Sequence, residues 1–148
     1  MRTKKENIDL TQASSCICFN LRKTSRTITK IYDEALRVVN LRVTQFSILA
    51  FVYYYKNITI TLLSNELAMD RTTLTRNLKP LERGKFIDIR KQEDPRYKTI
   101  SLTSKGKEIF QNALPVWSQV QANVVQRIGL ADADHLISEL NRIRNTAR

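Results

Sequence analysis

The order of helical and extended segments along the 148-residue chain constrains its fold more than any other feature of the sequence. Apolar residues recur every three or four positions, the period of an α-helix, in four successive segments: residues 14–39, 44–55, 59–67 and 71–83. Two short runs with strand character follow at residues 86–90 and 99–102, and the polar residues 91–98 between them predict an exposed hairpin tip. Helical periodicity resumes at Thr103 and again after Gly129. The sequence therefore predicts a mainly α fold with one small β-hairpin.

Capping residues and prolines predict where these helices begin, end and bend. Three side chains suited to N-capping stand at the starts of helical segments: Thr44, Thr59 and Asp70. Gly84 is expected to end the helix over residues 71–83. Pro80 is expected to bend the last turn of that helix, because it removes a backbone hydrogen bond, and Pro115 is expected to kink the helix that starts at Thr103.

The excess of basic residues indicates a polyanionic partner. With 25 Lys and Arg against 14 Asp and Glu, the net charge of +11 suits nucleic acid, an anionic membrane or an acidic protein, or serves only to keep the surface soluble. The longest apolar run, residues 48–55, is far shorter than the roughly 20 residues of a membrane helix, and no apolar signal-peptide core follows the charged start. We therefore expect a soluble cytoplasmic protein without a membrane partner, folded as one domain over residues 1–148.

The segment 71–83 has the pattern of a recognition helix. At 100° per residue, Leu74, Leu78 and Leu81 share one face and are expected to anchor the helix to the core. The opposite face carries hydroxyl, methyl and basic groups: Thr72, Thr75, Arg76, Lys79 and Arg83. Such groups suit base edges and phosphates in a major groove, and the free N–H groups at the helix start favour phosphates as well. Taken alone, the face is equally typical of a solvated amphipathic helix.

The predicted hairpin adds a second basic element directly after this helix. Arg96 stands at its tip, where an arginine can enter a minor groove, and Lys98 is placed to meet a phosphate. Asp94 would be repelled by DNA, so we expect it to orient a neighbouring arginine. The alternative is that residues 94–96 form only a tight turn. A helix-turn-helix followed by a hairpin predicts a winged helix.

These residues resemble the MarR family of bacterial transcription regulators. The similarity lies in LAMDRTTLTRNLKPLER at residues 67–83, DPR at 94–96 and LTSKG at 102–106. The stretch NLRVTQF at residues 40–46 is similar to a motif of close relatives that begins with glycine. The resemblance implies a homodimeric repressor on a pseudo-palindromic DNA site, released by a small molecule or an oxidant. It divides the chain into a winged helix-turn-helix over 44–103 and dimerisation helices over 11–39 and 104–148.

The predicted DNA-binding residues combine the helix face and the hairpin: Arg71, Thr72, Thr73, Thr75, Arg76, Lys79, Arg96 and Lys98. Apolar stripes on the terminal helices support the dimer independently, because they have little compact domain to cover. These stripes include Ile17, Leu21, Ile28, Leu136, Leu140 and Ile143. Pairing with a second copy would bury them and set two recognition helices about one turn of DNA apart.

A candidate redox sensor lies in the first helical segment. The stretch from Cys18 to Tyr32 resembles the organic-hydroperoxide sensors of the family, in which the cysteine is oxidised and the tyrosine holds its thiolate. The 14 residues between them span about 21 Å of helix, so the two side chains meet only across a dimer. Arg22 and Val43 stand where further tyrosines are expected. The alternative is that Cys16 and Cys18 are both small packing residues.

The other input that the family resemblance implies is a small aromatic or lipophilic effector. It would bind in the cleft between the dimer helices and the winged domain. Four aromatic residues are candidates to line that cleft: Tyr32, Phe46, Tyr53 and Trp117. Each is explained equally well as part of the core.

Catalysis, metal binding and a cofactor are not expected. The chain has no glycine-rich phosphate loop or paired-histidine motif, and its one histidine, His135, falls in an amphipathic segment. Two cysteines do not make a disulfide framework, and helix capping explains the nucleophile-like residues 103–106. The remaining alternative is an architectural DNA- or RNA-binding protein that uses the same basic surface without sequence specificity.

Overall fold

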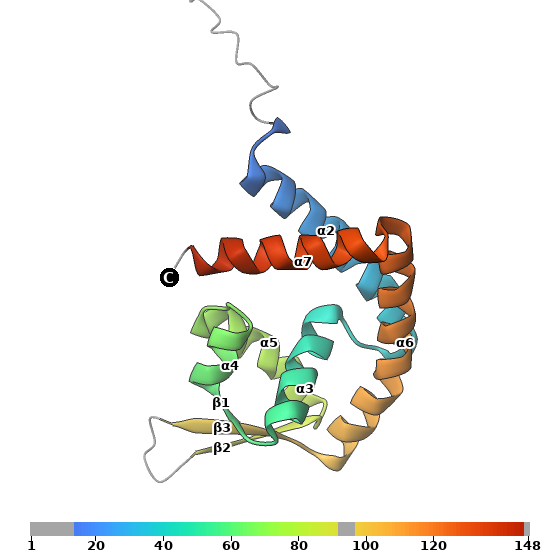
Figure 1. Ribbon diagram of the computed structural model, residues 1–148. Helices are drawn as coiled ribbons and strands as arrows, with labels where there is room; N and C mark the ends of the chain where they lie inside the picture. Colours follow the sequence, from blue (N-terminus) through green and yellow to red (C-terminus); the bar gives the residue numbers. More distant parts are fainter. Residues whose placement is uncertain (1–13, 92–96, 147–148) are drawn as a thin grey trace, which may run out of the picture.

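The computed structural model of the protein describes residues 14–91 and 97–146. Its elements follow in the order α2 (Ile17–Leu36), η1 (Arg37–Val39), α3 (Val43–Tyr55), β1 (Ile58–Thr59), α4 (Ile60–Glu66), α5 (Arg71–Arg83), β2 (Ile87–Lys91), β3 (Lys98–Leu102), α6 (Ser104–Ile128) and α7 (Leu130–Asn145). Figure 1 shows α3, α4, α5 and the sheet gathered together, with α2 and α7 above them and α6 running from the sheet to α7. The predicted fold class, mainly α with a small β wing between flanking helices, is confirmed.

The sheet has three antiparallel strands in the order β1–β3–β2. Both predicted strands are present with their ends shifted by one residue, and the hairpin ends where Lys91 pairs with Lys98. Strand β1 was not predicted: it covers only residues 58–59 and pairs Ile58 with Ile100. Two residues are too few to show the alternation of a strand. The pairing joins the segment before α4 to the wing.

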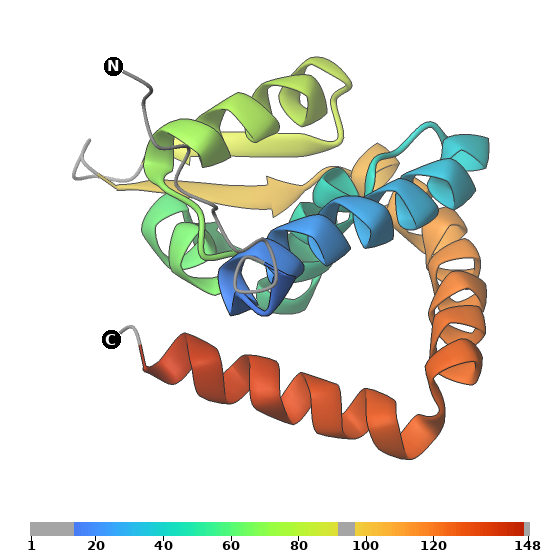
Figure 2. The same cartoon turned by 90° about the horizontal axis from the view of Figure 1, so that it is seen from above.

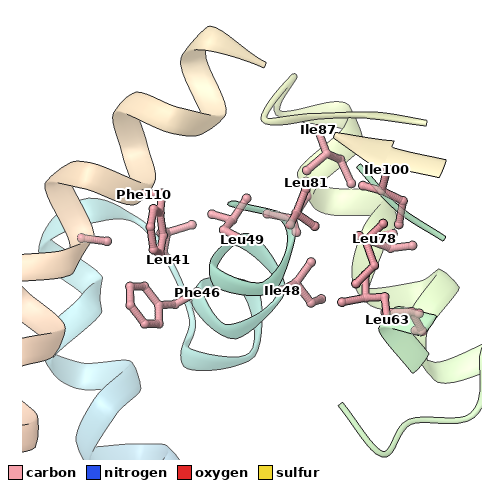
Figure 3. Packing of buried hydrophobic residues seen from close by; sticks show 14 of the residues in the cluster. Leu41, Phe46, Ile48, Leu49, Leu63, Leu78, Leu81, Ile87, Ile100 and Phe110 are labelled. Atoms are coloured by element: carbon pink, nitrogen blue, oxygen red, sulfur yellow. The ribbon is translucent and has the colours of Figure 1, made fainter. Parts of the chain in front are cut away.

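Helix α3 is the centre of the core. It is apolar on nearly every side, as a fully buried helix must be, and Ile48, Leu49 and Val52 have no accessible surface. Figure 3 shows side chains from the surrounding helices and strands converging on it. They include Leu63, Leu74, Leu78, Leu81, Ile87, Ile100 and Phe110. The expectation that three leucines anchor α5 is confirmed, and burying each such side chain contributes about 1.5–3 kcal/mol.

The start of α3 is capped from another helix. The prediction that Thr44 is the N-cap is wrong, because α3 begins at Val43 and Arg42 is the N-cap residue. The Val43 N–H donates to Oδ1 of Asp33 on α2 at 2.7 Å, and Arg42 Nη1 contacts Oδ2 of the same carboxylate at 3.2 Å. Gln45 Oε1 accepts from the Arg42 N–H at 2.9 Å. Asp33 thus joins α2 to the buried helix.

The other two predicted N-caps are confirmed. The Thr59 hydroxyl accepts from the Leu62 N–H at 3.1 Å, and Asp70 Oδ1 accepts from the Thr73 N–H at 2.8 Å. Helix α5 continues through Pro80 to Arg83, with Gly84 as its C-cap residue. Helix α6 likewise continues through its proline as a single element.

Helices α2, α6 and α7 flank the winged domain. The Tyr32 hydroxyl on α2 donates to Oε1 of Gln121 on α6. Figure 2 shows α7 turning back from the end of α6. Among the described residues no single helix is long and apolar enough to cross a bilayer; residues 17–39 and 43–55 meet that test only together, and the pair is bent by 73°.

Three helical segments end on a residue other than glycine in the left-handed conformation. The residues are Asn40, Ala68 and Lys85, with φ of 55°, 49° and 58°. In each case the residue that follows donates its N–H six residues back, as Met69 does to the Ser64 carbonyl at 2.9 Å. Ala68 lies in the turn between α4 and α5, where the Cβ atom makes this conformation costly.

We predict that Ala68→Gly stabilises the protein by roughly 0.5–1 kcal/mol, because glycine adopts positive φ without the steric cost. The measurement is urea unfolding followed by circular dichroism. Ala122→Gly, on an exposed position inside α6, is the matched control and should lose about 1 kcal/mol, because glycine weakens a helix interior. Destabilisation by both substitutions would contradict the prediction.

Candidate nucleic-acid interface

Asp70 fixes the first turn of α5. Its Oδ1 accepts from the Thr73 N–H at 2.8 Å, and its Oδ2 accepts from the Thr73 hydroxyl at 2.6 Å. These hydrogen bonds lower the pKa of the Asp70 carboxyl below its ordinary value of 3.8, so the group is ionised at neutral pH. The hydroxyl of Thr73 therefore serves the helix start, and this side chain is half-buried.

The outward face of α5 is exposed as predicted. Thr72, Thr75, Arg76, Lys79 and Arg83 all lie at the surface, opposite the buried leucines. The Thr75 hydroxyl donates to the Arg71 carbonyl at 2.7 Å. Arg76 has neither a hydrogen bond nor an ion pair with any residue in the described ranges 14–91 and 97–146. The guanidinium is therefore available to an external acceptor.

Arg71 is held at the junction of the two helices. Its Nη2 donates to the hydroxyl of Thr61 on α4 at 2.7 Å. The bond orients the guanidinium at the surface and leaves its other N–H groups for a phosphate. Thr61 was not predicted as a functional residue, because nothing in the local sequence shows that it lies beside the start of α5.

The recognition helix and the base of the wing border two hollows. One, of about 210 Å³, is lined by Thr59, Ile60, Thr61, Arg71, Thr75, Tyr97 and Lys98. The other, of about 260 Å³, is lined by Ile60, Thr75, Leu78, Lys79, Glu82, Ile89, Lys91 and Lys98. Figure 2 shows α5 lying alongside the strands of the wing. The structure thus brings Thr75 and Lys98, which are predicted DNA contacts 23 positions apart, to the same hollows.

Two residues at the base of the wing were missed as functional candidates. Lys91 stands directly opposite Lys98 across the β2–β3 ladder, and both side chains are exposed. Like charges in this arrangement repel each other, and an anion between them would relieve the repulsion. Tyr97 is 54% exposed and lines the smaller hollow. Arg96, the predicted minor-groove contact, lies outside the described residues, as does Asp94.

The two cysteines and Tyr32 have different surroundings. Cys16 and Cys18 are both exposed, so the interpretation of both thiols as packing residues is wrong for the single chain. Tyr32 is buried, which raises the pKa of its hydroxyl, and it bonds to Gln121. Cys18 and Tyr32 belong to one uninterrupted helix, so they are separated by about 21 Å along its axis.

Three of the proposed cleft-lining aromatics form a cluster with Phe110. The Phe46 ring lies 5.4 Å from Phe110 and 5.6 Å from Trp117, stacked on the latter with 17° between the ring planes. Tyr53 lies 5.0 Å from Phe110. The cluster joins α3 to α6, and Phe46 is fully part of the core.

A helix-turn-helix that is braced by an antiparallel wing and presents a basic recognition helix defines the winged-helix class of DNA-binding proteins. A family model, the transcriptional regulators SarA/Rot, matches residues 30–113 of this chain. The chain belongs to that family and is a DNA-binding transcription regulator of the MarR-like winged-helix type. The predicted resemblance to MarR regulators is therefore confirmed.

Similar proteins and structures agree with this assignment. The organic hydroperoxide resistance transcriptional regulator of Bacillus subtilis (strain 168) is 32% identical over 101 residues, which cover 68% of this chain and 69% of that protein. The crystal structure of the transcriptional regulator MosR of M. tuberculosis in complex with DNA has a TM-score of 0.80 and 35% identity, over 90% of this chain and 99% of that one. E. coli MarR with operator DNA shares the fold, with a TM-score of 0.80 and 19% identity over 91% of this chain and 98% of that one.

Proposed function

We propose that this regulator is a homodimeric repressor that binds a pseudo-palindromic DNA operator and is released by a small effector or by cysteine oxidation. The observation that carries the proposal is the outward face of α5, held by three buried leucines and set beside the paired lysines of the wing. In this proposal it acts on DNA in the cytoplasm, without catalysis, a metal or a cofactor. The proposed division of labour assigns DNA binding to residues 44–103 and dimerisation to 11–39 and 104–148.

The recognition helix supplies two kinds of contact in this proposal. Thr72 and Arg76, exposed near the start of α5, read base edges in the major groove. Arg71, Lys79 and Lys98 hold phosphates on either side of it. MosR, whose crystal structure contains DNA, supports the same class of partner for this chain.

The dimer proposal rests on apolar side chains that the single chain leaves at the surface. Ile17 on α2 is 65% exposed, and Leu130 and Ile137 on α7 are 69% and 51% exposed. Side chains of this size on helices at both ends of the chain are covered when a second copy packs against them. The two recognition helices then face successive major grooves about 34 Å apart.

The release step has two candidate signals. For oxidation, Cys18 is exposed to a hydroperoxide, and the similar Bacillus subtilis protein is a regulator of organic hydroperoxide resistance. In this proposal Tyr32 approaches Cys18 of the other subunit across the dimer. For ligand binding, a small aromatic or lipophilic molecule would sit beside the Phe46 cluster between the flanking helices and the winged domain.

The operator proposal is tested by selecting duplexes from a randomised pool with the full chain. Affinity for a selected duplex is then compared with that for a scrambled duplex and for RNA of the same length at the same salt. A preference of 10³-fold or more for the selected duplex is expected of a specific regulator. Equal affinity for all three would establish the alternative, an architectural nucleic-acid-binding protein.

Arg76 and Lys79 should fail in different ways. We expect Arg76→Ala to lose about 1–3 kcal/mol on the selected duplex and to relax the preference at one base position. Lys79→Ala should weaken binding to every duplex and reduce the salt-dependence slope by about one per subunit. Fluorescence anisotropy across a salt series measures both, with Lys107→Ala on α6 as the charge-matched control. Identical behaviour of the two variants would contradict the assigned roles.

A charge on α7 should separate the subunits. We expect Ile137→Glu to weaken the dimer by tenfold or more, which is about 1.4 kcal/mol, because the carboxylate would be buried without a partner. Sedimentation equilibrium measures the dissociation constant. Ser138→Glu, on the adjacent exposed position of α7, is the control. A dimer unaffected by Ile137→Glu would place the interface elsewhere.

Oxidation is tested on Cys18. We expect cumene hydroperoxide to release the wild-type protein from the selected duplex and to leave Cys18→Ser bound, because serine does not form a sulfenic acid. Cys16→Ser, two residues away and equally exposed, is the matched control and should respond like the wild type. Release of both serine variants would retire the redox proposal and favour the small effector.

A further inference from the structure

The end of the recognition helix is bonded to the beginning of α6 through three successive carbonyl groups. The Lys105 ammonium donates to the Gly84 carbonyl at 3.0 Å. The Thr103 hydroxyl donates to the Lys85 carbonyl at 2.7 Å, and the Thr103 N–H donates to the Phe86 carbonyl at 3.1 Å. We call residues 84–86 and 103–106 together the junction.

The two halves of the junction also touch backbone to backbone. A Cβ atom on Gly106 would lie 1.8 Å from the Phe86 carbonyl oxygen and 2.8 Å from its carbon, so only glycine fits there without moving the backbone. A Cβ on Gly84 would lie 2.6 Å from the Phe86 ring. The Lys105 ammonium sits 4.9 Å from the centroid of that ring, a favourable cation–π distance.

The junction lies where all the DNA-binding elements meet α6. Residues 84–86 connect α5 to strand β2, and residues 103–106 connect strand β3 to α6. Helix α6 then runs to α7, which carries exposed apolar side chains. The orientation of the recognition helix and the wing relative to the proposed dimer helices therefore passes through these contacts.

We propose that the junction fixes the recognition helix and wing to α6 in the orientation that specific DNA binding needs, with Thr103, Lys105 and Gly106 as positioning residues. This inference rests on the proposed function. In a dimer, a small rotation of each winged domain about α6 changes the distance between two recognition helices, so only duplexes that require that distance are affected. Binding to phosphates at any register does not depend on it.

The Lys105 ammonium distinguishes positioning from direct contact. Lys105→Met keeps the alkyl chain and removes the hydrogen bond and the charge. We expect a loss of about three- to tenfold on the selected duplex, in line with the net strength of a hydrogen bond. Affinity for the scrambled duplex and the salt-dependence slope should stay at wild-type values. Lys107→Met removes the same charge two residues away and should change neither affinity.

Thr103 supplies a second, conservative test. Thr103→Ser keeps the hydroxyl that bonds both the Lys85 carbonyl and the Gly106 N–H, and it should bind the selected duplex like the wild type. Thr103→Ala should lose affinity for that duplex only. Gly106→Ala should show the largest loss, and if it does not fold, the lysine and threonine variants decide. All are measured at a temperature where circular dichroism shows each variant folded.

The outcomes separate the two proposals. If Lys105→Met weakens both duplexes equally and lowers the slope by about one per subunit, Lys105 is a phosphate contact and the positioning role is overturned. Wild-type affinity of Lys105→Met and Thr103→Ala for the selected duplex overturns it as well. If the wild-type protein itself does not prefer the selected duplex, the proposed function fails, whatever the variants do.

Discussion

Burial of α3 on all sides is the constraint on which the rest of the structure depends. Ile48, Leu49 and Val52 have no accessible surface, so α4, α5, α6 and the sheet must each contribute an apolar face around them. A helix enclosed in this way also needs partners for its first N–H groups, and Asp33 reaches across from α2 to provide one. The position of the recognition helix follows, because its three leucines fit only against this centre.

The net charge of +11 acquires meaning only from its placement. Some cations are neutralised within the protein, as Arg42 is by Asp33 and Arg142 by Glu139. On α5 and at the base of the wing, Arg76 and the paired lysines have no such partner in the described parts of the chain. Exposed ion pairs contribute little to stability, so the unpaired cations carry the stronger functional signal.

The sequence predicted α5 and its neighbours well because their signals are local. A capping aspartate, three leucines at helical spacing and a glycine at the end lie within fifteen residues. Contacts between distant segments left no such trace: the cap from Asp33 on α3, the two-residue strand β1, the bond from Arg71 to Thr61 and the bonds of Thr103 and Lys105. For the site, sequence could place Thr75 and Lys98 on separate elements, but only the fold brings them to one hollow. The exposure of Cys16 and Cys18 was likewise beyond a pattern of residue types.

The opposed ammonium groups of Lys91 and Lys98 make the wing respond to ionic strength in two opposite directions. In the free protein, dissolved ions screen the repulsion between the two strands and steady the hairpin. In a complex, the same ions compete with the nucleic acid for these ammonium groups and loosen the bound state. A rise in salt therefore favours the unbound form twice over, and the salt content of the surroundings becomes part of what sets occupancy.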